Sequence, residues 1–318
     1  MTAFKANGTP IVPTRGMESG LTNLAAAIEA EYGGMGLHSL TRFGKTTLAE
    51  YIEACHGWLD TPYVATLARL RDLKSGQGAF YDWFTARLGL QPIPQQAPEQ
   101  KLLRIVNTVT LKTQSSKAKL FLFIMDDANL LEAESFQYFI DIDNALEEGG
   151  QRFFLLSLFQ DNHTVGRREK INKLIVTPQV RSRFLTRYHA LHGLRGIADL
   201  HTYLQRFEDE VETAPGSGVT LPRRMAPSLY DSGWRMCESA QLIWETGQQY
   251  RAAAGKQVDG EWPLKAFSLI ANFLATRTIC KPMFSTITAP EIELAVQFSD
   301  LAAYDGESGE VDFSDEDD

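Results

Sequence analysis

The first part of the chain alternates strand-like apolar runs with amphipathic segments. The apolar runs lie at residues 35–40, 63–68, 120–125 and 153–158, and residues 188–191 lead into a last strand. Amphipathic segments that predict helices lie at residues 18–32, 46–56, 80–88, 99–111 and 132–146. The run at 120–125 is apolar at every position, which is typical of a strand covered on both faces. This alternation predicts an α/β fold built on a parallel sheet.

The strand pattern stops at about residue 197. Segments 199–212, 232–254, 263–276 and 289–303 have helical character, with glycine-rich breaks between some of them. We therefore expect four parts in the chain. These are an N-terminal arm at 1–17, an α/β core at 18–196, a helical lid domain at 197–304 and an acidic, disordered tail at 305–318.

Charge is distributed unevenly along the 318 residues. The net charge is −9, but residues 305–318 contain eight acidic residues and no basic one, so the rest of the chain is nearly neutral at −1. Residues 101–119 carry five basic residues and no acidic one, and residues 163–195 carry eight against a single glutamate. Two such segments predict local binding of polyanions. Three scattered cysteines and the lack of a long apolar run predict a cytoplasmic protein without a membrane partner.

Residues Ser39 to Thr46, SLTRFGKT, have the spacing of a phosphate-binding P-loop. Gly44 lets successive backbone N–H groups point into one concavity, Lys45 reaches the β- and γ-phosphates, and the Thr46 hydroxyl holds Mg²⁺. The helix after Lys45 adds a favourable dipole beneath the anion. The alternative is a chance match on a lysine-capped helix. We assign nucleotide binding to Ser39, Arg42, Phe43, Gly44, Lys45, Thr46 and Thr47.

The apolar run at 120–125 ends in two carboxylates, Asp126 and Asp127. An acidic residue at the carboxyl end of a buried strand is the second half of a P-loop nucleotide site. Asp126 would hold Mg²⁺ through water, and Asp127 lies where an attacking water is oriented. The alternative is that both residues only cap the strand. Hydrolysing enzymes of this kind usually carry Glu at the position of Asp127, so the shorter side chain predicts slow or partner-dependent hydrolysis.

Three further polar residues are candidates for the same site. Gln160, with Ser157 in reserve, lies near the end of the next strand, where it could contact the γ-phosphate or the water. Arg183 could act across a subunit boundary as an arginine finger. Arg235, at the start of a helix predicted over 235–254, could fold over the phosphates. The alternatives are a simple strand-to-loop transition, a solvated basic helix end and an ordinary surface arginine.

Taken together, these motifs resemble the AAA+ ATPases of the initiator type. More narrowly they resemble the transposition regulators of the TnsC/TniB group, with IstB and MuB as more distant relatives. The resemblance spans roughly residues 10–255 and depends on PIVPT, SLTRFGKTT, LFIMDDANLL, FFLLSLFQ, VRSRF with its continuation LTRYHALHGLRG, and SGWRMCESA. Ser39 departs from the leading glycine of the P-loop pattern, and Asp127 departs from the usual Glu.

The resemblance implies an ATPase with a P-loop NTPase (AAA+) fold that takes ATP and Mg²⁺. Such proteins bind ATP between subunits, assemble into rings or filaments on double-stranded DNA, and connect a target-selecting protein or RNA-guided complex to a transposase. It implies nucleotide and magnesium roles for Lys45, Thr46 and Asp126, and a role in hydrolysis for Asp127. It also implies an arginine finger at Arg183 and a lid arginine at Arg235.

The family places DNA contacts partly on the helix before the strand that carries the magnesium-binding carboxylate. This matches the basic segment at 101–119, and we expect Lys101, Arg104 and Lys112 to contact phosphates without regard to sequence. The alternative is a solvated helix face. The expected setting is the bacterial cytoplasm, on DNA.

Two other functions share these motifs. One is a helicase loader, and the other is a nucleotide-held DNA scaffold that hydrolyses little ATP. The acidic tail could bind a basic partner such as a transposase, or it could only keep the protein soluble.

Overall fold

The computed structural model describes residues 2–5, 7–70, 73–161, 178–255 and 260–302. The chain divides into two compact units. The first comprises Met1–Ser19, Leu40–Thr47 and Leu191–Asp318, and the second comprises Gly20–Ser39 and Leu48–Ala190. The tail expected at 305–318 lies outside the described residues, and the domain boundaries expected from the sequence stay predictions.

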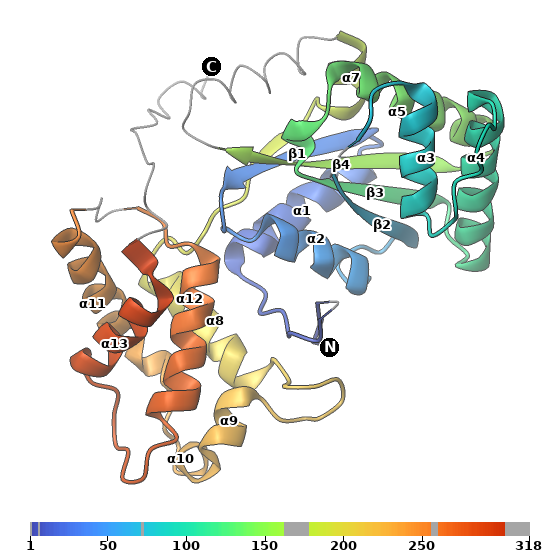
Figure 1. Ribbon diagram of the computed structural model, residues 1–318. Helices are drawn as coiled ribbons and strands as arrows, with labels where there is room; N and C mark the ends of the chain where they lie inside the picture. The colour runs from blue at the N-terminus through green and yellow to red at the C-terminus, as the bar shows by residue number, and fades with distance from the viewer. Residues whose placement is uncertain (1, 6, 71–72, 162–177, 256–259, 303–318) are drawn as a thin grey trace. The chain divides into compact units, whose positions relative to one another are not determined.

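A five-stranded sheet forms the centre of the second unit (Figure 1). Its strands are β1 (Gly34–Leu40), β2 (Tyr63–Arg69), β3 (Leu120–Asp126), β4 (Arg152–Asp161) and β5 (Tyr188–Ala190). Their order is β2-β3-β4-β1-β5, with β2 parallel to β3, β3 to β4 and β1 to β5. The strands match the predicted apolar runs, and the predicted α/β fold with a parallel sheet and a helical C-terminal part is confirmed.

Helices cover both faces of this sheet, which explains why β3 is apolar and buried along its whole length (Figure 1). One face carries α3 (Gln77–Arg87), α4 (Pro98–Ser115), α5 (Ala133–Glu148) and α7 (Pro178–Phe184), and the other carries α1 (Arg15–Glu29) and α2 (Lys45–Ala54). The α3 side is packed with aromatic rings. Phe84 stacks on Phe123 with centroids 4.4 Å apart, and Phe139 stacks on Phe153 at 6.2 Å.

The C-terminal part of the first unit is helical, as expected. It contains α8 (Ile197–Asp209), α9 (Leu221–Met225), α10 (Pro227–Asp231), α11 (Ala240–Ala253), α12 (Leu264–Phe273) and α13 (Ala289–Ser299). Its core includes Trp262, which is fully buried and stacks on Trp244 with centroids 4.7 Å apart. A Cβ at Gly247 would lie 2.2 Å from the Trp262 ring, so the ring requires glycine at this position.

We call this helical part, from α8 to α13, the helical unit, and two of its details differ from the prediction. The helix expected from Arg235 begins five residues later, because Met236–Ser239 form a 3₁₀ turn before α11 starts at Ala240. The short helices α9 and α10 were not predicted at all. Each has a proline in its first turn, where the missing N–H costs nothing, but five residues are too few to show a helical period.

Among the described residues, no helix combines the length and the apolar character needed to cross a membrane.

Candidate functional site: a P-loop and a carboxylate edge

The P-loop motif forms a tight turn between β1 and α2. Leu40 ends the strand and Lys45 begins the helix, so only four residues make the connection. Two of them have left-handed backbone conformations, with φ of 70° at Arg42 and 104° at Gly44. Glycine adopts such an angle readily, whereas Arg42 adopts it at some cost. The loop therefore has the sharp backbone turn that a phosphate cradle requires.

Burial and hydrogen bonds hold this loop in place. The Phe43 side chain is buried at 7% exposure, and the backbone carbonyl of Arg42 accepts a hydrogen bond from the backbone N–H of Lys265 at 3.3 Å. Lys45 is also buried, and its ammonium donates to the Leu40 carbonyl at 2.9 Å. Lys45 thus lies across its own loop, where a phosphate bound by the loop would come within its reach. The roles of the loop residues Ser39 to Thr47 in nucleotide binding stay predictions.

Asp126 and Asp127 lie at the carboxyl end of β3. Asp126 is only 3% exposed, and its Oδ1 accepts the N–H of Asp127 at 3.2 Å. Asp127 has a left-handed conformation with φ of 59°. A non-glycine residue in this region is uncommon, although aspartate tolerates it better than most, and such residues gather at functional sites. The turn redirects the chain immediately after the buried carboxylate.

Sequence reasoning missed two residues around Asp126. Arg69 is its register partner on β2, with Nε 4.0 Å from the Asp126 carboxylate. Asn129, buried in the turn after Asp127, accepts the backbone N–H of Gln160 at 3.2 Å and so ties the end of β4 to the turn after β3. Arg69 could have been found as the first charged residue after a strand-like run. Asn129 gives no signal without the register of β3 against β4.

Strand β4 lies between β3 and β1 in the sheet. Gln160 is near its carboxyl end, as predicted. Ser157 is fully buried beside Met125, and its hydroxyl has no hydrogen-bond partner among the residues that the structure describes. Thr46 and Asp126 supply hydroxyl and carboxylate oxygens, the donor types that Mg²⁺ prefers. The buried carboxylate at a strand end fits such a role, which stays a prediction, as does the role of Gln160.

Arg183 on α7 is held by α5. Its Nε lies 2.7 Å from Asp143, its Nη1 donates to Asn144 at 2.7 Å, and its Nη2 lies 3.8 Å from Glu147. An arginine that reaches a neighbouring subunit would have to leave these partners. The role of Arg183 as an arginine finger stays a prediction. Such a role would require free energy to break the ion pair with Asp143. Of the second basic segment, residues 163–177 lie outside the described part of the chain.

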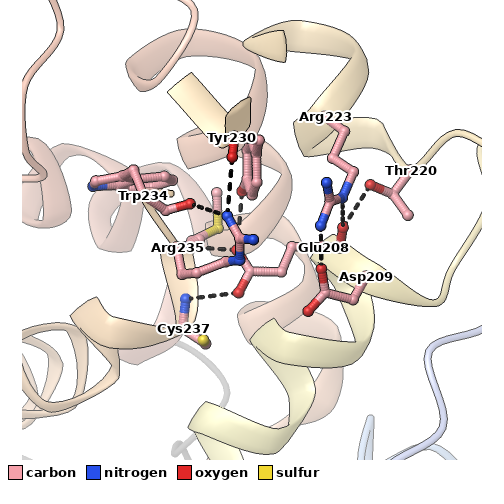
Figure 2. A network of polar contacts seen from close by, with 9 residues as sticks. Glu208, Asp209, Thr220, Arg223, Tyr230, Trp234, Arg235 and Cys237 are labelled. Carbon is pink, nitrogen blue, oxygen red and sulfur yellow. Dashed lines mark hydrogen bonds and ion pairs between the residues drawn. The ribbon is translucent and has the colours of Figure 1, made fainter. Parts of the chain in front are cut away.

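Arg235 lies in a polar network of the helical unit (Figure 2). Its Nη1 donates to the carbonyls of Tyr230 at 3.2 Å and Trp234 at 2.8 Å, and its guanidinium lies 5.8 Å from the centroid of the Tyr230 ring. The centre of this network is Glu208, whose side chain is fully buried. The role of Arg235 as a lid arginine stays a prediction.

Glu208 binds three donors that come from beyond its own helix. Its carboxylate accepts the Tyr230 hydroxyl at 3.0 Å and the backbone N–H groups of Met236 at 2.7 Å and Cys237 at 3.2 Å (Figure 2). Burial, and then the charge of Glu208, raise the pKa of Tyr230 far above its usual range. A buried carboxylate with all its bonds made is stable, but losing one donor or one acceptor is costly.

The basic residues of α4 turn toward α3 and the segment after it. Lys101 is buried, with Nζ 2.6 Å from the Asp82 carboxylate and 3.3 Å from the Gly78 carbonyl. Arg104 donates to the Gln91 carbonyl at 2.8 Å, and Lys112 to the Leu88 carbonyl at 2.9 Å. Both are half-buried. Contact of these three with DNA stays a prediction, and Lys101 would have to give up an ion pair to make it.

No protein-family model matches this sequence, and no curated protein sequence matches it significantly. Among solved structures, the chain is similar to a variant of RuvB from Thermotoga maritima, with 13% identity and a TM-score of 0.45 over 90% of this chain and 69% of that one. It is also similar to Cdc6p from Pyrobaculum aerophilum, with 13% identity and a TM-score of 0.38 over 95% and 84%. A chain of Drosophila ORC bound to DNA matches with 12% identity and a TM-score of 0.39, over 90% and 62%.

The burial of Asp143 predicts a pH dependence of stability. Burial raises the pKa of Asp143 to about 6, with Arg183 opposing the rise and Glu147 adding to it. In an unfolded chain the pKa is about 4, so the group stabilises the fold below about pH 4, and this contribution is lost as the pH rises through about 6. We expect Asp143→Asn to remove about 1–2 kcal/mol of this dependence, measured by urea unfolding between about pH 4 and pH 7.

The exposed Asp60 serves as the control, and Asp60→Asn should leave the pH profile as it is in the parent. A profile of Asp143→Asn identical to that of the parent would rule out this account of the buried pair.

The Glu208 network predicts a second effect on stability. Glu208→Gln places an NH₂ group among three donors, so at least one buried N–H loses its acceptor, and we expect the helical unit to lose about 2–3 kcal/mol of unfolding free energy. The matched control is Asp209→Asn next to it, which breaks a surface pair with Arg223 (2.6 Å) and should cost less than about 1 kcal/mol. Equal losses in chemical denaturation would contradict the central place of Glu208.

Proposed function

We propose that this chain is an AAA+ ATPase that assembles on double-stranded DNA when it binds ATP and Mg²⁺. More narrowly, we propose a regulator of DNA transposition that links target-site selection, by a protein or an RNA-guided complex, to transposase recruitment. The observation that carries the proposal is the carboxyl edge of the sheet. β1 leads directly into the P-loop, β3 ends in Asp126 and Asp127, and β4 with Gln160 lies between these two strands.

The proposed reaction is attack of water on the γ-phosphate of ATP, which breaks the bond from the γ-phosphorus to the β–γ bridging oxygen and releases ADP and inorganic phosphate. Lys45 binds the β- and γ-phosphates, and the N–H groups of the loop turn around them. Thr46 and Asp126 would hold Mg²⁺, which when bound adds positive charge beside the β- and γ-phosphates. Asp127 orients the water and accepts its proton, and Gln160 contacts the water or the γ-phosphate.

Two arginines complete the proposed site. Arg183 of one subunit would stabilise charge on the nucleotide of its neighbour, after leaving Asp143 on its own α5. Arg235 would bring a second positive charge from the helical unit. Hydrolysis in this scheme times the disassembly of the oligomer from DNA.

One observation favours a second function, a nucleotide-held scaffold that hydrolyses little ATP. Asp127 is one methylene shorter than glutamate, and its backbone is fixed in a left-handed turn. The missing methylene shortens the reach of the carboxylate toward a water at the γ-phosphate. Turnover of ATP by the purified chain, alone and then with DNA and transposase, separates a partner-stimulated ATPase from a scaffold that is inactive in both conditions.

The first test of the proposed function is particle size and shape by electron microscopy, with a non-hydrolysable ATP analogue and with or without duplex DNA. We expect rings or filaments only when both are present. Lys45→Ala should abolish them because the phosphates lose their main cationic ligand. The control Lys74→Ala removes an exposed lysine and should assemble as the parent does. A monomer that responds to neither ligand would overturn the proposal.

In the proposed complex, α4 contacts DNA phosphates through Lys101, Arg104 and Lys112. The contribution of α4 can be tested by changing Arg104 and Lys112 and leaving the buried Lys101 in place. We expect the double variant Arg104→Ala/Lys112→Ala to weaken binding to duplex DNA uniformly across sequences and to reduce the slope of log K against log salt by about 2, as lost phosphate contacts require. Arg224→Ala/Arg277→Ala removes the same charge from exposed positions of the helical unit and serves as the control. Equal slopes for both double variants, measured by fluorescence anisotropy, would place the DNA elsewhere.

A further inference from the structure

A lysine side chain of the N-terminal arm contacts the P-loop helix. The ammonium of Lys5 donates to the hydroxyl of Thr47 at 2.9 Å. Thr47 is the third residue of α2, two positions after Lys45, so this contact lies in the first turn of the helix. Both residues belong to the first compact unit.

The arm backbone holds Lys5 in a small hairpin. Phe4 and Pro10 form an antiparallel bridge, the N–H of Lys5 donates to the Thr9 carbonyl at 2.8 Å, and the N–H of Gly8 donates to the Lys5 carbonyl at 2.8 Å. Gly8 has φ of 79°, which a turn of this kind requires. Lys5 is thus presented from a folded segment, which reduces the entropy lost when its side chain binds a ligand.

The same arm is anchored on the helical part of its unit. The hydroxyl of Thr2 donates to the Glu210 carbonyl and accepts the N–H of Glu212, both at 3.1 Å. Arg206 on α8 donates to the Pro13 carbonyl at 3.0 Å, and Ile11 and Val12 are buried. The arm therefore connects the end of α8 with the first turn of α2.

The electrostatics of a helix N-terminus favour an anion beside the contact between Lys5 and Thr47. The N-terminus of a helix carries partial positive charge, so a lysine ammonium is unfavourable there and an anion is favourable. Here Lys5 places its ammonium against Thr47 in that first turn, and Lys45, the first residue of α2, places its own on the Leu40 carbonyl before the loop. A polyanion bound by the loop would attract both ammonium groups and the helix N-terminus together.

We propose that Lys5 is a further ligand of the nucleotide phosphates, and that a bound nucleotide fastens the N-terminal arm to the P-loop. This inference rests on the proposed nucleotide-binding function of the P-loop. Lys5 adds a contact from outside the motif, and through the arm it links the occupancy of the loop to α8. A purely structural role, in which Lys5 serves to hold the arm on α2 through Thr47, makes a different prediction.

The test uses Lys5→Gln in the full chain, with calorimetric titration of ATP. Glutamine retains hydrogen-bond donors for Thr47 but loses the charge. We expect about a tenfold weaker Kd for ATP, as the loss of one charge-assisted phosphate contact predicts. Lys5→Arg should restore most of the affinity, and the exposed-lysine control Lys74→Gln should bind as the parent does. Affinity of Lys5→Gln equal to that of the parent would overturn the inference.

Amide hydrogen exchange of the arm gives a second readout that does not depend on activity. We expect ATP to slow exchange at residues 2–13 in the parent and to leave it unchanged in Lys5→Gln. Equal protection in both would also overturn the link. Lys45→Ala distinguishes the proposed nucleotide binding by the P-loop from the proposed contact of Lys5 with the phosphates. If the parent binds ATP, Lys45→Ala does not and Lys5→Gln binds normally, only the role of Lys5 fails. If the parent binds no nucleotide, both proposals fail.

Discussion

A strand that is covered on both faces can carry a charged side chain only where it leaves the sheet, and β3 meets this constraint at Asp126. Six apolar residues before it are buried between helices, so the first carboxylate stands at the carboxyl edge. In a parallel sheet the neighbouring strands have their carboxyl ends at the same edge, and the P-loop follows the carboxyl end of β1. The positions of the candidate residues therefore follow from how the core is packed, and the polar edge is a consequence of the apolar centre.

The sequence was sufficient for those parts of the molecule that repeat a physical period. Runs of strand length and amphipathic helices predicted β1 to β4 and most of the helices, because burial imposes the pattern directly. The turn between β1 and α2 and the position of Asp126 at the end of a buried strand were also predicted, since their residues are contiguous in the chain. Contacts between distant segments could not be predicted from the sequence. Glu208 with Met236, Asn129 with Gln160 and Lys5 with Thr47 are each separated by 28 or more residues, and nothing local marks one partner for the other.

The basic residues show how far charge alone can be interpreted. A count of lysine and arginine along α4 and α7 indicates polyanion binding, yet Lys101 is paired with Asp82 and Arg183 with Asp143. In each case the partner lies on another helix, so the pairing is invisible in the local charge balance. A long cationic side chain close to the core finds an internal carboxylate or carbonyl before it meets a ligand. Its availability for DNA or nucleotide is then set by the free energy of breaking that internal contact.

The setting of Arg235 limits how it can move. The residues on either side of it are fixed, because Tyr230 and Met236 are both bound to the buried carboxylate of Glu208, and its own guanidinium donates to two nearby carbonyls. A swing of the side chain would break its two hydrogen bonds to the carbonyls of Tyr230 and Trp234 and leave the Glu208 bonds in place. The guanidinium thus serves as an internal brace of the loop before α11, and any ligand that draws it away has to compensate for two lost hydrogen bonds.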